Sequence, residues 1–476
     1  MKPYEVLIIG GGLGGLTCAA ALAKKGRRIL LLERNPALGG YQATYKRSGF
    51  TIEPCLHVMA EAGPDGSVSQ LLRELGLGGE IEFSRFNPTS QFIFPDRTLA
   101  IPSDGQEFLG LLKDLFPHEP SGIDGIFDCM NGISRGLGEA PGANPMVAEY
   151  SQKVLQVLLD QFIAEKKLQT MIAGYCTYFA LPPSRVSSLL MSAFTASLIF
   201  KGGFSPEGGV KRIVDLLEKV VVTHGGEVRK KAPVQSIAVK GGKATGVVLE
   251  NAEEIQAENV VSNADARMTF FSWVGEGKLP PDYVARLKKV EIMDSALNVF
   301  LGVKAQGLGL ENMAPAICHF PGYDLDEQYQ AMQKGEIERS NFWIGIPTLT
   351  NPFMAPEGHH LIVLYVPVPY RLEGIRWRHH KEDFTQRLIN MAEKAIPGLR
   401  KNIVLVDAAT PDTLVRYTGN SQGAVAGWAC TPEADALRPA NQTPIEGLFL
   451  AGHWTLPGPG TGSVMHSGWL TASMIP

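Results

Sequence analysis

Three glycines lie near the start of the chain, between a short apolar run and an Ala- and Leu-rich run. Gly10, Gly12 and Gly15 follow the apolar residues 6–9 and lead into residues 16–25. A strand that ends in this spacing and continues as a helix is typical of dinucleotide binding. The first glycine permits a tight turn, the second lets a pyrophosphate approach the backbone, and the third lets helix and strand pack closely. Free N–H groups at the start of the helix attract the phosphates. The feature therefore predicts a Rossmann-like α/β unit.

A second apolar run, residues 28–33, ends in Glu33. Because both runs are apolar on successive residues, we expect strands of a parallel sheet that is covered on both faces. The carboxylate of Glu33 is placed to accept hydrogen bonds from a ribose 2′-hydroxyl, and its charge disfavours a 2′-phosphate. Gly39 and Gly40 form a second glycine pair past this acid. NAD does not require such a pair, whereas the longer FAD runs past a turn of this kind, so the pattern favours FAD.

The composition indicates a folded protein of two or three domains. The chain has 476 residues, of which 45% are hydrophobic and 19% charged. The net charge is −4 and basic runs do not exceed short pairs such as Lys230-Lys231, so we expect no nucleic-acid partner. The six cysteines are scattered without CxxC spacing. This favours reduced thiols in a cytoplasmic protein over a disulfide framework, and we predict no metal site.

Two observations bear on membranes. The first apolar strand starts close to the initiator Met, so we expect no cleavable signal peptide. The longest nearly uncharged run, residues 186–200, is shorter than the roughly 20 residues that a transmembrane helix needs. We expect a buried helix there. A helix that lies against one membrane face is the alternative, so peripheral membrane contact stays open.

Hydrophobic periodicity predicts the remaining elements. Strands are expected within residues 81–102 and at 227–229, 234–239, 245–249, 259–262, 296–303, 361–366 and 448–451. Helices are expected at 146–200, with an interruption at 181–183, and at 210–224, 384–395 and from 463 onward.

Four stretches in the rest of the chain carry a family resemblance. They are the turn at residues 203–209, Val234 in an alternating apolar run, the Val-Val-Ser-Asn-Ala-Asp segment 260–265, and the glycine-rich segments 447–452 and 457–462. With the glycine turn, they make the chain similar to the phytoene desaturase, carotenoid isomerase and retinol saturase-like FAD-dependent oxidoreductases of the flavin amine oxidase superfamily. The resemblance implies that the last segment brings a glycine to the pyrophosphate and directs the N-terminus of the final helix at the flavin ring.

The resemblance also implies a fold: a discontinuous Rossmann-like FAD-binding domain of the glutathione-reductase type, with an inserted mixed α+β substrate domain. The FAD-binding parts are expected at 1–80, 205–285 and 420–476, and the substrate domain at 81–204 and 286–419. The expected cofactor contacts are Gly10, Gly12, Leu13, Gly14, Gly15, Glu33, Arg34, Gly39, Gly40, Tyr41, Val234, Asn263, Gly452, Gly460, Gly462, Ser463 and Val464.

One departure from the family pattern lies near Phe50. Where the family has Phe-Asp-x-Gly, this chain places Cys55 at the small glycine. His57 lines up with a histidine of the saturase-like and isomerase-like branch. Because a histidine titrates near neutral pH, His57 is the candidate catalytic residue for proton transfer or for polarising the substrate. The alternative is a histidine that only forms hydrogen bonds within a loop.

The resemblance favours desaturation, saturation or isomerisation of C–C and C=C bonds in an apolar polyene or isoprenoid. Such chemistry needs a hydride carrier in a dry channel and few acid–base groups. The sequence does not indicate which molecule accepts or donates the electrons.

Two alternatives remain. A flavin amine oxidase would place an aromatic residue before the last helix, where Trp454 or Tyr417 could substitute. A non-enzymatic prenyl-lipid escort of similar fold would not need the intact glycine turn or Glu33. A two-dinucleotide reductase would need a second glycine turn with its acid, and Gly307-Leu308-Gly309 lacks that context.

Overall fold

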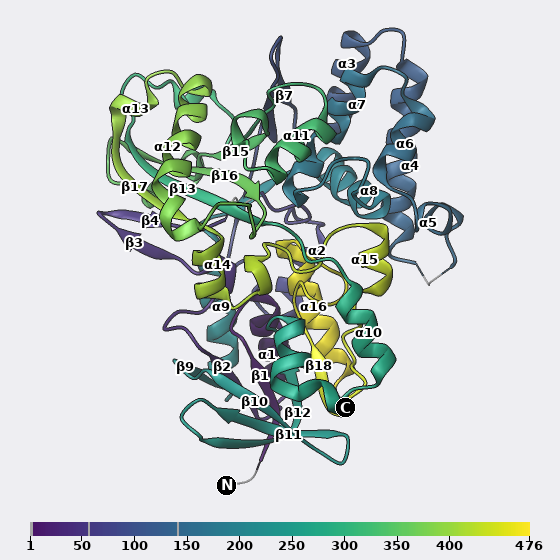
Figure 1. Ribbon diagram of the computed structural model, residues 1–476, viewed down its shortest axis with the longest axis vertical. Helices are drawn as coiled ribbons and strands as arrows, with labels where there is room; N and C mark the ends of the chain where they lie inside the picture. Colours follow the sequence, from purple (N-terminus) through teal and green to yellow (C-terminus); the bar gives the residue numbers. More distant parts are fainter. Residues whose placement is uncertain (1–2, 56–57, 140–141) are drawn as a thin grey trace.

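The computed structural model describes residues 3–55, 58–139 and 142–476, and two seven-stranded sheets organise the chain (Figure 1). The first sheet has the order β10-β11-β12-β1-β2-β9, and β18 also pairs with β12. Its strands are β1 (Tyr4–Ile9), β2 (Ile29–Glu33), β9 (Glu227–Lys230), β10 (Val234–Lys240), β11 (Lys243–Leu249), β12 (Glu254–Ser262) and β18 (Leu448–Leu450).

The centre of this sheet is parallel and buried on both faces. β1 pairs in parallel with β2 and β12, and β12 pairs in parallel with β18. Val6 and Ile8 pack against α1 (Leu13–Lys24), α9 (Val210–Thr223) and α16 (Thr461–Met474). Leu7 and Ile9 pack on the opposite face, against the β10–β11 ribbon and α10 (Pro281–Lys289). The prediction of a parallel sheet covered on both faces is confirmed.

The second sheet has the order β17-β13-β16-β15-β14-β6-β7. Neighbouring strands are antiparallel, except that β14 and β6 run parallel. Its strands are β6 (Ser90–Ile93), β7 (Thr98–Ile101), β13 (Ser295–Lys304), β14 (Ala316–His319), β15 (Phe342–Gly345), β16 (His359–Val368) and β17 (Ile403–Ala409). Helix α12 (Trp377–Ala395) buries Trp377, Phe384 and Leu388 against one face.

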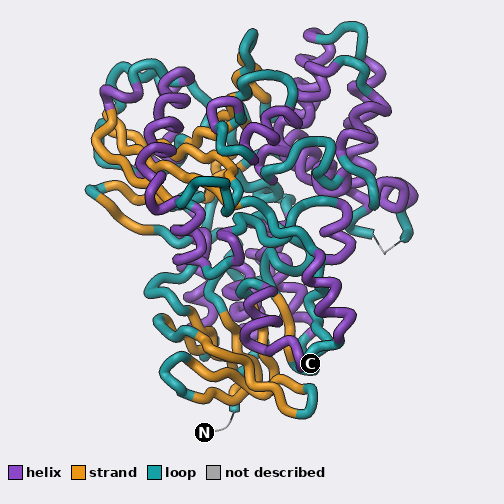
Figure 2. The backbone as a smooth tube through the Cα atoms, viewed as in Figure 1, coloured by secondary structure: helices purple, strands orange, loops and turns teal. Residues whose placement is uncertain are grey.

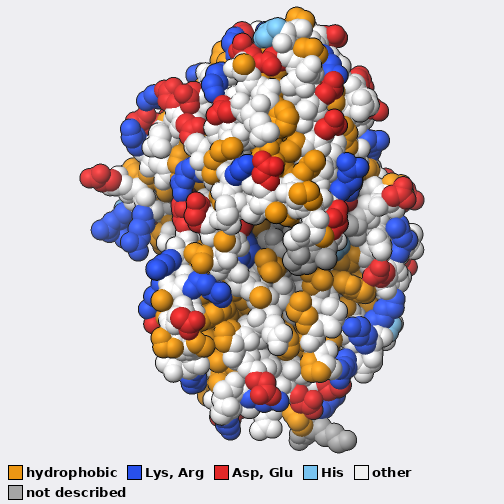
Figure 3. Space-filling view, turned by 90° about the vertical axis from the view of Figure 1, so that its right-hand side faces the viewer, with side chains coloured by type: hydrophobic (Ala, Val, Ile, Leu, Met, Phe, Trp, Pro, Cys, Tyr) orange, Lys and Arg blue, Asp and Glu red, His pale blue; other side chains and the backbone are white. Residues whose placement is uncertain are grey.

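A layer of helices packs beside the second sheet, at the upper right of Figure 1. It contains α3 (Gly105–Leu115), α4 (Pro120–Gly136), α5 (Pro145–Tyr150), α6 (Leu155–Phe162), α7 (Lys166–Ala173) and α8 (Ser188–Ala196). In this part of the chain the sequence predicted helices only from residue 146, whereas the helical layer begins at Gly105. Figure 3 views the molecule from this side and shows hydrophobic side chains interspersed with charged ones.

Shorter elements connect these parts. They are the hairpin β3 (Tyr45–Arg47) and β4 (Phe50–Ile52), the pair β5 (Phe83–Arg85) and β8 (Phe204–Pro206), and the helices α2 (Ser67–Glu74), α11 (Leu325–Gln333), α13 (Leu399–Asn402), α14 (Pro411–Thr418) and α15 (Pro432–Leu437). Across the described ranges, no helix is both long and apolar enough to cross a membrane.

The two sheets interleave along the chain. Strands of the first sheet come from residues 4–33, 227–262 and 448–450, and strands of the second come from 90–101 and 295–409. Figure 2 shows the two groups of strands at opposite ends of the molecule, joined by helices and loops. This is the discontinuous α/β architecture that the sequence predicted, although the boundaries at 80, 204, 285 and 419 stay predictions.

Candidate functional site

The glycine turn joins β1 to α1 with almost no space for side chains. Gly10 has a positive φ of 97°, and its N–H donates to the carbonyl of Leu32 at 2.8 Å. A Cβ on Gly15 would overlap the carbonyl oxygen of Gly10, and a Cβ on Gly14 would lie 2.9 Å from the backbone nitrogen of Gly452. Leu13, the first residue of α1, is buried. The turn therefore fits a ligand that approaches the start of the helix through backbone contacts alone.

Glu33, at the end of β2, holds this turn through hydrogen bonds. Its carboxylate accepts the N–H of Gly11 at 2.8 Å and the N–H of Asn35 at 2.7 Å, and the residue is 5% exposed. The carbonyl of Glu33 accepts the N–H of Ala232 at 2.9 Å. This bond brings the segment that contains Val234 to the same end of the sheet. Val234, a predicted cofactor contact, therefore follows two residues after a backbone contact of Glu33.

Asn263 and Gly452 meet the glycine turn from two distant segments. The N–H of Asn263 donates to Ile9 at 2.8 Å, and its side-chain nitrogen lies 3.3 Å from the carbonyl of Gly10. Gly452 has a positive φ of 90°, and a Cβ there would overlap the side-chain oxygen of Asn263. Its N–H donates to Ser467 Oγ at 3.0 Å. Backbone contacts thus bring residues 10–15, 263 and 452 together.

Gly39 and Gly40, the second glycine pair, lie next to the glycine turn. The N–H of Gly39 donates to Gly11 at 2.8 Å, and a Cβ on Gly40 would lie 3.3 Å from the Cα of Gly12. Gln42 then reaches the start of α16, since its Nε2 lies 3.4 Å from Thr461 Oγ1. Its buried Oε1 has no hydrogen-bond partner among the residues that the structure describes.

The first turn of α16 carries the remaining predicted contacts. Gly460 precedes the helix, and Gly462, Ser463 and Val464 are partly exposed in its first turn. The first N–H groups of a helix have no partner within the helix and attract negative charge. This helix start and the orphaned amide oxygen of Gln42 fit a polar ring system with both donors and acceptors, such as a flavin.

Of the other predicted residues, Arg34 points away from the glycine turn, Tyr41 reaches the segment around residue 424, and one is not described. Arg34 is exposed, and its guanidinium donates to the carbonyl of Arg416 at 2.5 Å, which directs the side chain toward residues 416–419. The Tyr41 hydroxyl donates to the carbonyl of Ala424 at 2.7 Å. His57, the predicted catalytic residue, lies outside the described residues.

Asn420 ties three segments of the site together and was missed from the sequence. Its Nδ2 donates to the Tyr41 hydroxyl at 3.2 Å and lies 3.4 Å from His453 Nε2, and its Oδ1 accepts the indole N–H of Trp454 at 3.0 Å. Burial and the nearby charge of Arg438 lower the pKa of His453 to about 4, so its imidazole is neutral at physiological pH. His453 could have been predicted as a site residue because it directly follows Gly452. Nothing in the sequence marks Asn420 as a site residue.

Two buried carboxylates, those of Asp265 and Glu53, accept backbone N–H groups of segments around the site. Asp265 accepts the N–H groups of Met268 at 2.8 Å and Ser421 at 2.6 Å, and burial raises the pKa of its carboxyl. Glu53 accepts the N–H of Lys211 at 3.3 Å, at the start of α9. Burial raises the pKa of Glu53 to about 7. A Cβ on Gly209 would overlap this carboxylate, which explains the glycine at that turn.

An aromatic wall, defined here as Tyr175, Tyr178, Phe194, Trp343 and Tyr365, connects residues 174–196 to strands β15 and β16 of the second sheet. Tyr178 stacks on Trp343 with ring centroids 4.1 Å apart, and its ring meets Phe194 edge-on at 5.8 Å. Tyr365 in β16 is paired with Trp343 in β15. Tyr178, Phe194 and Tyr365 are partly exposed although they pack against a buried core.

Tyr365 connects the aromatic wall to the glycine-pair segment. Tyr365 and Tyr41 both pack against the buried cluster that contains Phe50, Ile52 and Val363. Burial raises the pKa of the Tyr365 phenol above the usual range. The wall therefore faces the side of the site that residues 41–55 form.

The two aromatic residues considered for an amine cage are placed differently. Trp454 is 1% exposed and packs edge-on against Trp428, with ring centroids 4.8 Å apart. Tyr417 is 58% exposed. One is therefore a core residue and the other a surface residue.

Comparisons with known proteins agree with this geometry. The family model for flavin containing amine oxidoreductases matches residues 13–475. Prolycopene isomerase from Daucus carota is 29% identical, over 100% of this chain and 80% of its own length. Human all-trans-retinol 13,14-reductase is 25% identical, over 95% of this chain and 82% of its own length. The crystal structure of an oxidoreductase from Methanosarcina mazei superposes with a TM-score of 0.70 at 19% identity, and covers 98% of this chain and 99% of that one.

The family model begins at Leu13, after β1, and spans the rest of the first sheet, the whole second sheet and the site from α1 onward. The chain therefore belongs to the flavin-containing amine oxidoreductase family and is a flavin-dependent oxidoreductase.

Proposed function

We propose that this protein is an FAD-dependent oxidoreductase that desaturates, saturates or isomerises C–C and C=C bonds of an apolar polyene or isoprenoid. The observation that carries the proposal is the aromatic wall beside the predicted flavin site. Its partly exposed members are aromatic rings, which suit a flat, conjugated hydrocarbon. The carrot and human relatives, named as a prolycopene isomerase and a retinol reductase, support this substrate class.

The length of the predicted cofactor surface supports FAD over a shorter flavin. The glycine turn suits a pyrophosphate, Glu33 a ribose, and the buried Val234 an adenine, while the start of α16 suits the ring. A flavin mononucleotide lacks the adenosine that Glu33 and Val234 would bind. The contacts of these residues with a cofactor are part of the proposal.

Each part of the chain has a physical task in the proposed reaction. A bound flavin supplies a hydride acceptor or donor. The positive end of α16 favours negative charge at the ring. Asn420, which also contacts the neutral His453, fixes the neighbouring Tyr41. The aromatic wall excludes water and orients the apolar chain. His57 remains the predicted group for proton transfer.

The aromatic placements favour this function over an amine oxidase. A cage around an amine needs aromatic faces that stand free on both sides of the nitrogen. Trp454 is enclosed by Trp428, and Tyr417 projects into solvent. Neither side chain is placed to serve as half of such a cage.

The function can be tested with purified holoprotein under anaerobic conditions. We expect a carotenoid, a retinoid or another isoprenoid to bleach the oxidised flavin, or to be saturated or isomerised when the flavin is reduced first. Phe194→Ala should raise KM for that substrate about 10-fold, as expected for loss of roughly 1.4 kcal/mol of apolar contact. Phe353→Ala, at a ring that is exposed on the surface, is the matched control. Bleaching by amines alone would contradict the proposal.

A further inference from the structure

Asn298, in the middle of β13, is a buried amide beside the aromatic wall. It lies directly opposite Tyr365 of β16 in the antiparallel register, and Tyr365 lies opposite Trp343 of β15. Side chains at directly opposed positions of neighbouring strands project to the same face of a sheet. Asn298 therefore shares a sheet face with Tyr365 and Trp343, which both belong to the aromatic wall.

The same sheet face also reaches the segment that follows the second glycine pair. Ala296 and Phe300, two residues before and after Asn298, lie on this face because side chains alternate along a strand. Both belong to a buried cluster against which Tyr41 and Tyr365 pack. Tyr41 directly follows the second glycine pair. The face that carries Asn298 is therefore shared by the aromatic wall and by this part of the predicted cofactor site.

The polar atoms at the aromatic wall differ in whether they have a partner within the protein. The indole N–H of Trp343 donates to Thr177 Oγ1 at 2.9 Å. The hydroxyl of Tyr175 is paired with a serine hydroxyl. The side-chain oxygen of Asn298 and the hydroxyl of Tyr178 are buried as well, but neither has a hydrogen-bond partner among the residues that the structure describes.

The two unpartnered atoms indicate a ligand that forms hydrogen bonds. A buried polar atom without a hydrogen bond is uncommon, because its desolvation is not compensated. Asn298 is 5% exposed. Burial raises the pKa of Tyr178 well above its usual value, so the hydroxyl keeps its proton and remains a donor. The rings of Tyr178 and Tyr365 are partly exposed, which leaves part of the wall free to contact a ligand.

A hydroxyl group suits both unpartnered atoms. It donates one hydrogen bond, which the Asn298 oxygen can accept, and it accepts hydrogen bonds, which a phenol can donate. A carbonyl would leave the Asn298 oxygen without a donor. A carboxylate would need a cation, and the aromatic wall has no basic side chain. A hydrocarbon would leave both atoms without a partner.

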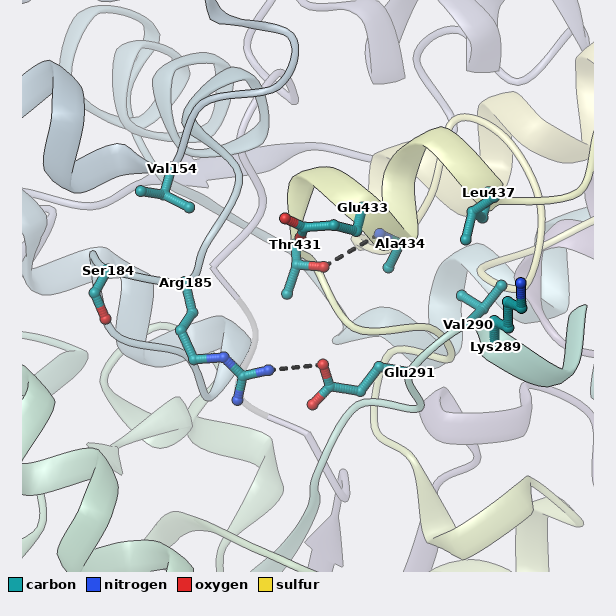
Figure 4. A pocket seen from close by; sticks show the side chains of 10 residues that line it. All are labelled: Val154, Ser184, Arg185, Lys289, Val290, Glu291, Thr431, Glu433, Ala434 and Leu437. Carbon is teal, nitrogen blue, oxygen red and sulfur yellow. Dashed lines mark hydrogen bonds and ion pairs between the residues drawn. The ribbon is translucent and has the colours of Figure 1, made fainter. Parts of the chain in front are cut away.

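The surface pocket shown in Figure 4 has a different character. Its volume is about 390 Å³, and the residues that line it include Arg185, Lys289, Glu291 and Glu433. Arg185 is directed toward Glu291 and donates to its Oε2 at 2.7 Å. Charged walls disfavour an apolar chain, because the chain would desolvate them. This pocket therefore does not replace the aromatic wall as the place for an apolar substrate.

We propose that Asn298 determines substrate specificity by binding a hydroxyl group, so that the substrate is a polyene or isoprenoid alcohol and not a hydrocarbon. The side-chain oxygen of Asn298 accepts the hydroxyl hydrogen, and Tyr178 donates to an oxygen of the same molecule. This specificity rests on the proposed function, because it concerns the substrate that the aromatic wall binds. Neither residue transfers a proton or a hydride in this role.

The first test uses the holoprotein without substrate. Tyr178→Phe removes a buried hydroxyl that has no partner, so the urea concentration at the unfolding midpoint should stay the same or rise. Tyr175→Phe, in the same wall, is the matched control. It breaks a hydrogen bond with Ser90 and should lower the midpoint. An equal decrease in both variants would show that the Tyr178 hydroxyl has a partner within the protein, which would overturn its role.

The second test compares the turnover of polyene alcohols with that of matched hydrocarbons. One pair is all-trans-retinol and the hydrocarbon of the same carbon skeleton, and the other is a monohydroxylated carotene and its parent carotene. The wild-type protein should prefer the alcohol at least about 10-fold in kcat/KM, because the hydrocarbon leaves buried polar atoms of the protein without partners.

Substitution of Asn298 should remove this preference. Asn298→Leu should raise KM for the alcohol about 10-fold, with the flavin content unchanged. Asn298→Ala should give the same result with a smaller side chain, which excludes overpacking as the cause. Asn390→Leu is the matched control, because Asn390 is exposed on α12, which covers the opposite face of the same sheet. This variant should keep the preference of the wild type.

The outcomes separate this specificity from the proposed function. Wild-type protein that converts hydrocarbons as fast as alcohols contradicts the specificity alone, and so does a preference that Asn298→Ala leaves intact. Wild-type protein that accepts no polyene or isoprenoid of either kind contradicts the proposed function, and the specificity with it.

Discussion

Glu33 shapes the glycine turn through contacts within the protein. Its two carboxylate oxygens each accept a backbone N–H, from Gly11 and from Asn35. Each oxygen keeps a further lone pair, so the carboxylate can accept ribose hydroxyls without releasing the turn. One side chain therefore fixes the turn and faces the predicted ribose position.

Glu33→Ala removes the acceptor of one buried and one partly buried N–H group. The alanine variant also lacks the carboxylate that would accept the ribose hydroxyls. We expect FAD to bind about 10- to 100-fold more weakly, because each lost hydrogen bond to a charged group costs on the order of 1–3 kcal/mol. Glu33→Gln keeps an acceptor oxygen and should lie between Ala and the wild type. Titration of apoprotein with FAD, followed by flavin fluorescence, measures the change. Unchanged FAD affinity in the Ala variant would contradict the ribose assignment.

The residues that were predicted and those that were missed differ in kind. Gly10, Gly15 and Glu33 were predicted because a tight turn next to a pyrophosphate tolerates few residue types. Asn420 was missed because its role depends on Tyr41, His453 and Trp454, which meet only after folding. The spacing of residues in the sequence indicates the glycines and the acid of the turn. The role of a residue such as Asn420 depends on tertiary contacts.

Helices α1 and α16 approach each other closely through small residues. A Cβ on Gly468 would overlap the carbonyl oxygen of Gly14 and would lie 2.9 Å from the backbone nitrogen of Cys18. Both neighbours are backbone atoms of α1, so they cannot move aside as a side chain would. The close approach also positions the first turn of α16 next to the glycine turn.

Gly468→Ala should separate these two helices. We expect the free energy of unfolding to fall by about 1–3 kcal/mol, as in other overpacked cores, and FAD to bind more weakly because the start of α16 moves. Gly110→Ala is the matched control. Gly110 is exposed within α3 and a Cβ there would meet open space, so alanine should stabilise the helix by up to about 1 kcal/mol. Urea unfolding curves decide the outcome, and equal stability of Gly468→Ala and the wild type would refute the packing argument.

The first helices of the helical layer show why some elements were not predicted. Helix α4 carries apolar residues at helical spacing, but it also contains several glycines, which lower helix propensity. A Cβ on Gly125 would lie 2.7 Å from the ring of Phe162, and a Cβ on Gly132 would overlap Met146. These glycines let neighbouring helices pack against α4. In the sequence, glycines at this frequency are typical of a loop. Only the packing of the helices explains why they occur within α4.

Across the whole molecule, the site joins segments that are far apart in the sequence. The glycine turn, Asn263 and Gly452 are in contact, and Gln42 reaches Thr461 at the start of α16. The sequence predicted this convergence because motifs at both ends and in the middle resembled one family. No motif marked the members of the aromatic wall, which come from residues 174–196 and from the antiparallel strands β15 and β16.

A ligand that bridges these segments should stabilise them together. We expect FAD to slow amide hydrogen exchange at least 10-fold in residues 10–15, 39–42, 231–234 and 452–464, because binding to the folded state opposes every opening that breaks the site. Strand β17, at the far edge of the second sheet, serves as the internal control and should exchange at the same rate with and without FAD. Mass spectrometry of peptides from apoprotein and holoprotein measures all of these segments in one experiment. Protection limited to residues 10–42 would mean that the N-terminal unit binds the cofactor alone, which would contradict a site shared by both ends of the chain.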